Sequence, residues 1–367
     1  MGKILLIGDV HLGLGFPNRT EHFFKVSKYY FEKFLLPIIE TKLTKDDIIV
    51  QLGDLFDNRN IVPINILNYA QTIIERMSKV CPVHILIGNH DIYNKSVNEI
   101  NSLKPFNYIP NVFVYEKTDK IQFNGKSILM MPWVEEKEEQ VRILKENSGC
   151  DYLFCHSDLN GAKMHLTSVA HRNSDKIDVE EFSGYKGVYS GHIHLVQKTK
   201  NFTFVGSIHE MDRNDIDNQK GIFVLDTNKE TEIFIPNKVS PNFKKIYVNK
   251  EEDIEQLNDG ITKDWIDLYV SNSLLVNNRK IRRKLETILQ NGTFASVEYI
   301  DDISLNNEPK EEDEKINESL SINLDYSEYI KNFINTTNYE TDKVKTGILA
   351  EFETIVEIYK ESKKKLD

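Results

Sequence analysis

Five short polar motifs follow hydrophobic runs, and they limit what this 367-residue chain can fold into more than any other feature. In chain order the motifs are Gly8-Asp9-Val10-His11, Gly53-Asp54-Leu55-Phe56-Asp57, Gly88-Asn89-His90-Asp91, Cys155-His156-Ser157 and Gly191-His192-Ile193-His194. Four of them lie at or just after the C-terminal end of a run that predicts a β-strand. Because ligands of open α/β sheets collect beyond the carboxyl ends of strands, we expect loops to bring these motifs together.

The pattern around the motifs predicts a layered α/β fold, because β-rich runs alternate with amphipathic segments. Strands are expected at residues 4–7, 47–52, 83–87, 127–131, 152–155 and 187–189. Helices are expected at residues 21–39, 64–80 and 135–146, where apolar side chains recur with helical spacing. Asn124-Gly125 predicts a hairpin, and after Gly184 the pattern is all-β, with runs at 196–199, 202–205, 222–225 and 232–235.

The chain divides into four expected parts. Residues 1–240 form the main domain, which ends near Pro236 to Pro241, and residues 241–300 alternate strand and helix as a small α+β module. Residues 301–318 carry eight acidic side chains against two lysines, so we expect a flexible linker over 301–320. Residues 321–367 return to helical spacing but are too few to bury a large core alone.

Composition excludes several classes of protein. No apolar run approaches the roughly 18 residues that span a bilayer, and a glycine and a charge interrupt the N-terminus before a signal-peptide core. Three cysteines without CxxC spacing suit a reduced compartment, so we expect a cytoplasmic location, in a bacterium or an infected host cell. The net charge of -11 does not exclude a polyanionic substrate, because the linker segment contributes -6 of it.

The residue types in the motifs suit divalent metal ions, which bind carboxylates, amide oxygens and neutral imidazoles. The expected ligands of one ion are Asp9, His11, Asp54 and His194, and those of the other are Asp54, Asn89, His156 and His192. A shared Asp54 would hold the ions about 3.5–4 Å apart, the separation that clamps an in-line displacement at phosphorus. A hydroxide bridging the ions would be the nucleophile.

His90 lies beside a ligand without being needed as one, so we expect it to approach the phosphate or protonate the leaving oxygen. Asp91 is expected to orient that imidazole. Any one of these motifs alone is usually an ordinary turn, and only the ordered set distinguishes a metal centre. The other histidines, which we expect to be surface or structural, are His22, His84, His165, His171 and His209, with His209 the main exception because it follows Gly206-Ser207.

The motif set resembles the calcineurin-like metallophosphoesterases, whose fold is a four-layer αββα sandwich around a binuclear centre. Within that superfamily the chain looks most like the SbcD-type recombination and repair nucleases, particularly the phage (T4-like) subunit. The features that carry this likeness are residues 8–13, Met131-Pro132-Trp133, residues 156–161 and residues 190–194. Many cellular members have a histidine three positions after the bridging aspartate, where this chain has Asp57, so the exonuclease role of that histidine is not carried over.

The resemblance implies a manganese-dependent nuclease, with magnesium as a possible substitute. It implies exonuclease action on duplex ends and endonuclease action on single strands or hairpins. It also implies a homodimer within a heterotetramer, through residues 64–77 and 104–109, and a partner ATPase of the SMC/ABC class that binds the C-terminal helices. For those helices the alternative is a tail that packs back on its own domain.

Basic residues offer candidate DNA contacts. Five positive charges lie within residues 279–284, namely Arg279, Lys280, Arg282, Arg283 and Lys284, and such patches bind phosphates. The alternative is an ordinary solvated helix face. Arg59 and Lys95, on the motif loops, are weaker candidates.

Two other functions use the same residues. A phosphomonoesterase acting on proteins or nucleotides would need the same metals, and only the extra module and tail argue against it. A non-enzymatic scaffold of this fold would have lost ligands, whereas every ligand type is present here.

Overall fold

The computed structural model describes residues 2–15, 20–94, 97–168, 170, 173, 175–256, 264–271, 274, 282–283, 294–300, 346, 350 and 352. The chain divides into two compact units, residues 1–300 and residues 301–367. The linker at 301–320 and nearly all of the tail lie outside the described residues, so the expected domain boundaries stay predictions. No described helix is long and apolar enough to cross a bilayer.

The first sheet contains six strands in the order β14-β13-β1-β2-β3-β6. Four strands run parallel: β1 (Ile4–Ile7), β2 (Ile48–Gln51), β3 (Val83–Leu86) and β6 (Val112–Tyr115). The other two, β13 (Gly221–Asp226) and β14 (Thr231–Pro236), add an antiparallel edge. β1, β2 and β3 are buried throughout, which explains their nearly unbroken apolar runs.

The second sheet also contains six strands, in the order β11-β12-β10-β9-β8-β7. The parallel strands are β8 (Lys126–Met131), β9 (Tyr152–His156), β10 (Gly187–Gly191) and β12 (Phe202–Phe204). Antiparallel edges come from β7 (Asp119–Phe123) and β11 (Gln197–Thr199). Asn124 and Gly125 both have positive φ between β7 and β8, which confirms the predicted hairpin.

Helices cover the outer faces of the sheets. A continuous helical stretch comprises α1 (Thr20–Tyr30), a π-helical turn η1 (Phe31–Leu35) and α2 (Leu36–Lys42), and α3 (Ile64–Ser78) follows β2. α4 (Lys137–Glu146) follows β8. The sequence did not predict the π-helical turn, the hairpin of β4 (Ile92–Asn94) and β5 (Val97–Asn101), or β6. Three 3-10 helices complete this part: η2 (Lys104–Tyr108), η3 (Val179–Phe182) and η4 (Arg213–Asp215).

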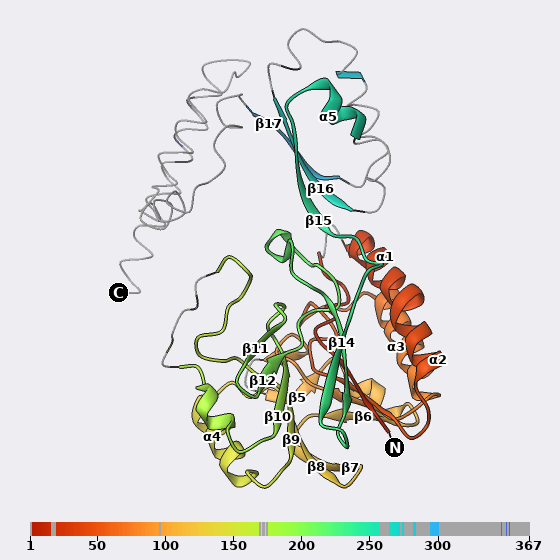
Figure 1. Ribbon diagram of the computed structural model, residues 1–367, viewed down its shortest axis with the longest axis vertical. Helices are drawn as coiled ribbons and strands as arrows, with labels where there is room; N and C mark the ends of the chain where they lie inside the picture. Colours follow the sequence, from red (N-terminus) through yellow and green to blue (C-terminus); the bar gives the residue numbers. More distant parts are fainter. Residues whose placement is uncertain are drawn as a thin grey trace. The chain divides into compact units, whose positions relative to one another are not determined.

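Three apolar clusters confirm the expected four-layer αββα sandwich. The helices on the outer sides of the two sheets can be followed in Figure 1. Alternate residues of β1 face opposite sides: Ile4 and Leu6 pack between the sheets with Phe154, whereas Leu5 and Ile7 pack in the cluster that contains the residues of α2 and α3. On the far side of the second sheet, Leu153 packs with Leu144 of α4.

The small module contains a three-stranded parallel sheet of β15 (Phe243–Val248), β16 (Trp265–Ser271) and β17 (Phe294–Ile300), with α5 (Glu251–Gln256) after β15. An aromatic pair and an ion pair connect this module to the sandwich. Trp265 stacks on Phe23 of α1 with ring centroids 5.1 Å apart, and Arg213 forms a two-pronged ion pair with the buried Asp267. The expected helix at 279–289 lies almost entirely outside the described residues.

This topology brings the polar motifs together. Asp9, Asp54 and Asn89 follow the adjacent parallel strands β1, β2 and β3. His156 ends β9, and it is in register with Gly191, the last residue of β10 before His192. All five motifs therefore follow strands, one more than the sequence pattern indicated.

Candidate metal centre

The predicted ligands form two groups of donor atoms. Asp9, His11 and His194 make up one group, and the ligand atoms of the three lie within 4.8 Å of one another. Asp54, His156 and His192 make up the second group, by the same measure. Each group consists of three members of one predicted ligand set, and ligation itself stays a prediction.

Asp54 lies between the two groups. Its Oδ2 is 3.6 Å from His11 Nε2 and 3.4 Å from His156 Nε2. Its Oδ1 accepts the main-chain N–H of His90 over 2.8 Å. One carboxylate oxygen is therefore fixed by the backbone, while the other faces imidazoles of both groups, as a bridging ligand requires.

Asn89 completes the second group. Its Oδ1 lies 2.9 Å from both His156 Nε2 and His192 Nδ1. The Nδ1 of His156 is directed away, toward the main-chain oxygen of Leu52 at 2.7 Å. Imidazoles in metal sites are typically held in this way, with one ring nitrogen free for the metal and the other bonded to the protein.

The donor atoms fit two divalent cations. Asp9 Oδ2 is buried and has no hydrogen-bond partner, which is rare for a carboxylate oxygen. His194 Nε2 lies 3.7 Å from that oxygen and 3.1 Å from His11 Nε2. Two ring nitrogens that face each other beside an unpartnered carboxylate oxygen can all be satisfied by one cation.

Three of the predicted ligands have a left-handed backbone. The φ angles of His11, Asp54 and His192 are +47°, +54° and +83°. Such conformations cost non-glycine residues on the order of 1–3 kcal/mol each, and they concentrate at functional sites. The left-handed backbone at these three residues directs their side chains into the metal centre.

Glycines allow the loops to approach one another. Only Gly53, among the glycines that open the motifs, has positive φ, at +98°. A Cβ on Gly88 would lie 2.2 Å from Asp54 Oδ1, and one on Gly191 would lie 2.6 Å from Asp9 Oδ1. At those two positions the glycine is needed for the close approach of a ligand carboxylate rather than for a sharp turn.

Asp91 has a different role from the one expected. Its carboxylate accepts the main-chain N–H groups of Asp54, Phe56 and Gly88 over 2.9, 3.1 and 3.0 Å. The His90 imidazole instead places its Nδ1 2.6 Å from the main-chain oxygen of Asp57. The expectation that Asp91 orients His90 is therefore wrong: Asp91 joins the loops after β2 and β3.

Two residues near the site had no role in the sequence analysis. The carboxylate of Asp57 lies 3.2 Å from His11 Nδ1, on the side of the ring away from Asp54. Trp133 packs against His192, with ring centroids 5.0 Å apart. The motif Met131-Pro132-Trp133 could have indicated this contact, because it follows the C-terminal end of β8 just as the metal motifs follow the C-terminal ends of their own strands.

Comparison with known proteins fixes the family. The calcineurin-like phosphoesterase family matches residues 2–196, which is more than half of the chain and includes all the predicted ligands. The chain belongs to the calcineurin-like phosphoesterase family. Enzymes of this family are hydrolases with a binuclear metal site.

Curated relatives of this phosphoesterase include viral proteins. Exonuclease subunit 1 of Enterobacteria phage T4 is 27% identical over 238 residues, 64% of this chain and 68% of the relative. Putative phosphoesterase 244L of Invertebrate iridescent virus 6 is 29% identical over 219 residues, 56% of this chain and 70% of the relative. Among solved structures, an archaeal phosphodiesterase is 12% identical and covers 64% of this chain and 99% of its own, but with a TM-score of only 0.33.

The remaining described histidines have hydrogen-bond partners outside the set of predicted ligands. His84 Nδ1 lies 2.7 Å from the Tyr115 hydroxyl, and His165 lies near Thr167. His209 is buried beside Ser27 and its Nδ1 lies 3.0 Å from the main-chain oxygen of Glu210. His171 and the side chain of His22 lie outside the described residues.

The candidate DNA contacts are only partly described. Arg59 is half-buried on the loop after Asp54, and Arg282 and Arg283 are exposed. Lys95, Arg279, Lys280 and Lys284 lie outside the described residues.

The carboxylates govern the charge state of two histidines before any cation binds. Burial alone would lower the pKa of His11, but the hydrogen bond that His11 donates to Asp57 and the charges of Asp54 and Asp9 raise that pKa to about 9. Burial likewise opposes protonation of His156, and the Asp54 and Asp9 charges together raise its pKa to about 9. At neutral pH both imidazoles of the metal-free protein are therefore doubly protonated and positively charged.

We predict that metal binding releases close to two protons, because a ligating imidazole must be neutral. Below a pKa of about 9, each obligatory proton makes the affinity rise roughly tenfold per pH unit. Mn²⁺ titration calorimetry at about pH 7, in buffers of differing ionisation enthalpy, counts these protons. An affinity that does not change between about pH 6.5 and 8 would contradict the raised pKa values.

Proposed function

We propose that this phosphoesterase is the nuclease subunit of a DNA recombination or repair complex. It would hydrolyse phosphodiester bonds, as an exonuclease on duplex ends and an endonuclease on single strands. The similarity to the phage exonuclease subunit, which extends over 64% of this chain, carries the proposal. The two donor groups that share Asp54 supply a matching centre.

Two divalent ions, Mn²⁺ with Mg²⁺ as a substitute, would supply the positive charge that binds the phosphate and activates water. The protein residues position this chemistry. Asp9, His11 and His194 hold one side, Asn89, His156 and His192 hold the other, and Asp54 joins them.

His90 is the proposed group that acts on the phosphate directly. Its ring lies 4.8 Å from that of His11, and its Nδ1 contacts the main-chain oxygen of Asp57. That contact fixes Nδ1 as the donor and leaves Nε2 for substrate. With a second proton, on Nε2, His90 can stabilise charge on the phosphate or pass that proton to the leaving oxygen.

Removing the His90 ring tests the nuclease proposal. In Mn²⁺, the purified chain should cut a labelled DNA duplex, and His90→Ala should lower that rate about 10²- to 10⁴-fold. His165→Ala, which removes a half-exposed histidine outside the site, is the matched control and should keep full activity.

Hydrolysis of a phosphomonoester dye, measured in parallel, distinguishes a nuclease from the alternative phosphomonoesterase. Little dye turnover beside DNA cleavage supports a nuclease. Dye turnover that depends on His90, with no DNA cleavage even when an ATPase partner is added, would contradict the nuclease proposal and favour a phosphomonoesterase.

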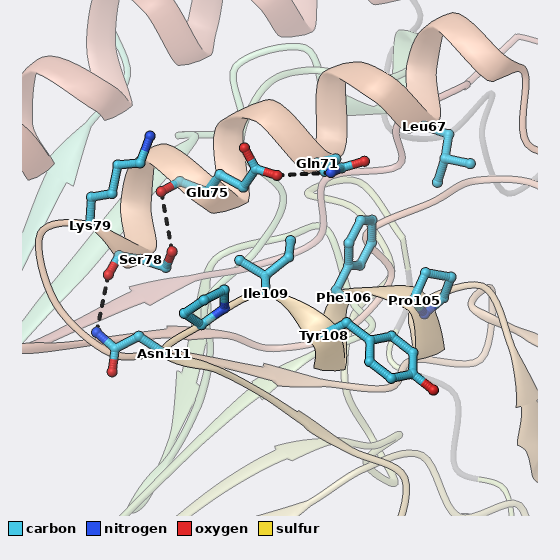
Figure 2. Close-up of a pocket in the computed structure, with 11 residues that line it drawn as sticks. Leu67, Gln71, Glu75, Ser78, Lys79, Pro105, Phe106, Tyr108, Ile109 and Asn111 are labelled. Carbon is cyan, nitrogen blue, oxygen red and sulfur yellow. Dashed lines mark hydrogen bonds between the residues drawn. The ribbon is translucent and has the colours of Figure 1, made fainter.

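We also propose a homodimer that uses α3 and η2. A groove of about 440 Å³ lies between them, and Leu67 and Gln71 on the helix face Phe106 and Ile109 across it (Figure 2). Ile64 at the start of α3 is 76% exposed, and Tyr108 of η2 is 88% exposed. Large apolar side chains exposed on one face are typical of protein interfaces.

The proposed partner is an ATPase of the SMC/ABC class, bound through the segment at 321–367, for which the sequence predicts helices. Together with the homodimer this makes a heterotetramer. The proposed DNA contacts are Arg59 and the basic residues at 279–284, of which Arg282 and Arg283 are described and exposed.

One sedimentation experiment tests both contacts. The full chain should be a dimer at micromolar concentration and should form a larger complex with its ATPase. A chain that ends at residue 320 should still dimerise and bind Mn²⁺ but should not bind the ATPase. A monomeric full chain would contradict the dimer, and a truncated chain that still binds the ATPase would contradict the docking role of the tail.

A further inference from the structure

A carboxylate that the sequence analysis left without a role lies beside one ligand. Asp158 follows His156 by two residues, in the loop after β9, and its Oδ1 lies 3.2 Å from His192 Nε2. The opposite nitrogen of the same ring, Nδ1, is 2.9 Å from Asn89 Oδ1 in the centre. The two ring nitrogens of His192 therefore face different partners.

We propose that Asp158 is a positioning residue of the metal centre, which holds His192 with Nδ1 toward the second ion. The inference rests on the binuclear part of the proposed function and not on the identity of the substrate. A neutral imidazole has one N–H and one lone pair. Because a carboxylate can only accept, Asp158 places the N–H on Nε2 and leaves the Nδ1 lone pair for the ion.

His192, like His11 and Asp54, is a predicted ligand with a strained backbone. Its φ of +83° is a strained conformation for a residue with a side chain. Trp133 packs along the ring and limits its tilt, but ring contacts cannot choose which nitrogen carries the proton. The Asp158 carboxylate, 3.2 Å from Nε2, supplies that choice.

Asp158 is itself held in place. Lys176 Nζ donates to the same Oδ1 over 3.0 Å, from the far end of the loop. The neighbouring Ser157 N–H donates to Ser190 Oγ over 3.1 Å, which joins the loop after β9 to β10. Lys176, Asp158 and His192 thus form a row from the protein surface to the centre.

The effect should be confined to one ion. His192 belongs to the group with Asp54 and His156, whereas Asp9, His11 and His194 form the other. Loss of an outer hydrogen-bond partner typically weakens metal affinity 10- to 100-fold. Asp158→Ala should therefore weaken the second Mn²⁺ by about 10- to 100-fold and leave the first within about twofold.

The test is an Mn²⁺ titration followed by electron paramagnetic resonance, which distinguishes coupled pairs of ions from single ions. The wild-type chain should fill both positions and give a coupled signal. Asp158→Ala should give the single-ion signal at the same Mn²⁺ concentration and recover the coupled signal only at higher concentration. Asp178→Ala is the matched control, since that carboxylate bonds Asn160 in the same loop and contacts no ligand.

Asp158→Asn separates positioning from charge. The amide oxygen can still accept the Nε2–H, so this variant should bind the second ion more tightly than Asp158→Ala does. A second ion bound equally well by the wild type and Asp158→Ala would overturn the proposal, as would equal loss in the Asn and Ala variants. A wild-type chain that binds a single ion would instead contradict the binuclear centre itself.

Discussion

The carboxylate of Asp54 lies where the carboxyl ends of the strands of both sheets meet, and contacts from the surrounding loops hold it in place. Burying a charged carboxylate costs on the order of several kcal/mol unless it is paired and hydrogen-bonded. Here Oδ1 accepts the His90 N–H, while Oδ2 faces His11 and His156. The charge-bearing imidazoles come from both sheets, so Asp54 links the two halves of the sandwich as well as the two groups of ligands.

The loops that support this carboxylate are strained and closely packed. Asp54 has positive φ, and Gly88 must lack a side chain for the adjacent loop to reach Asp54. Asp91 accepts four main-chain N–H groups from these two loops. Networks of this kind fix side-chain positions before any ligand binds. The rigid part of the centre is therefore built from backbone contacts, and the imidazoles are oriented by outer partners such as Leu52, Asp57 and Asp158.

Much of the fold and of the candidate site could be predicted from the sequence. β1 has the expected residues, and the ends of β2, β3, β9 and β10 were close to prediction, because buried parallel strands leave continuous apolar runs. Four of the five polar motifs could be recognised as candidates because they follow such a run. The composition of the donor atoms then indicated the metal chemistry without any coordinates.

The features that could not be predicted depend on contacts between distant segments. The turn at Phe31–Leu35 is still helical in sequence pattern, so its π-helical geometry leaves no periodic signal. Asp91 follows His90 directly, but its carboxylate meets the backbone of the loop 35 to 37 residues earlier. Likewise, only the pairing of β9 with β10 brings the loop of Asp158 next to His192.

Anomalous diffraction from crystals soaked in Mn²⁺ tests the central claim most directly, because it locates each ion independently of activity. The account predicts two peaks about 3.5–4 Å apart, one on each side of the Asp54 carboxylate. A single peak, or a pair that does not share Asp54, would contradict it.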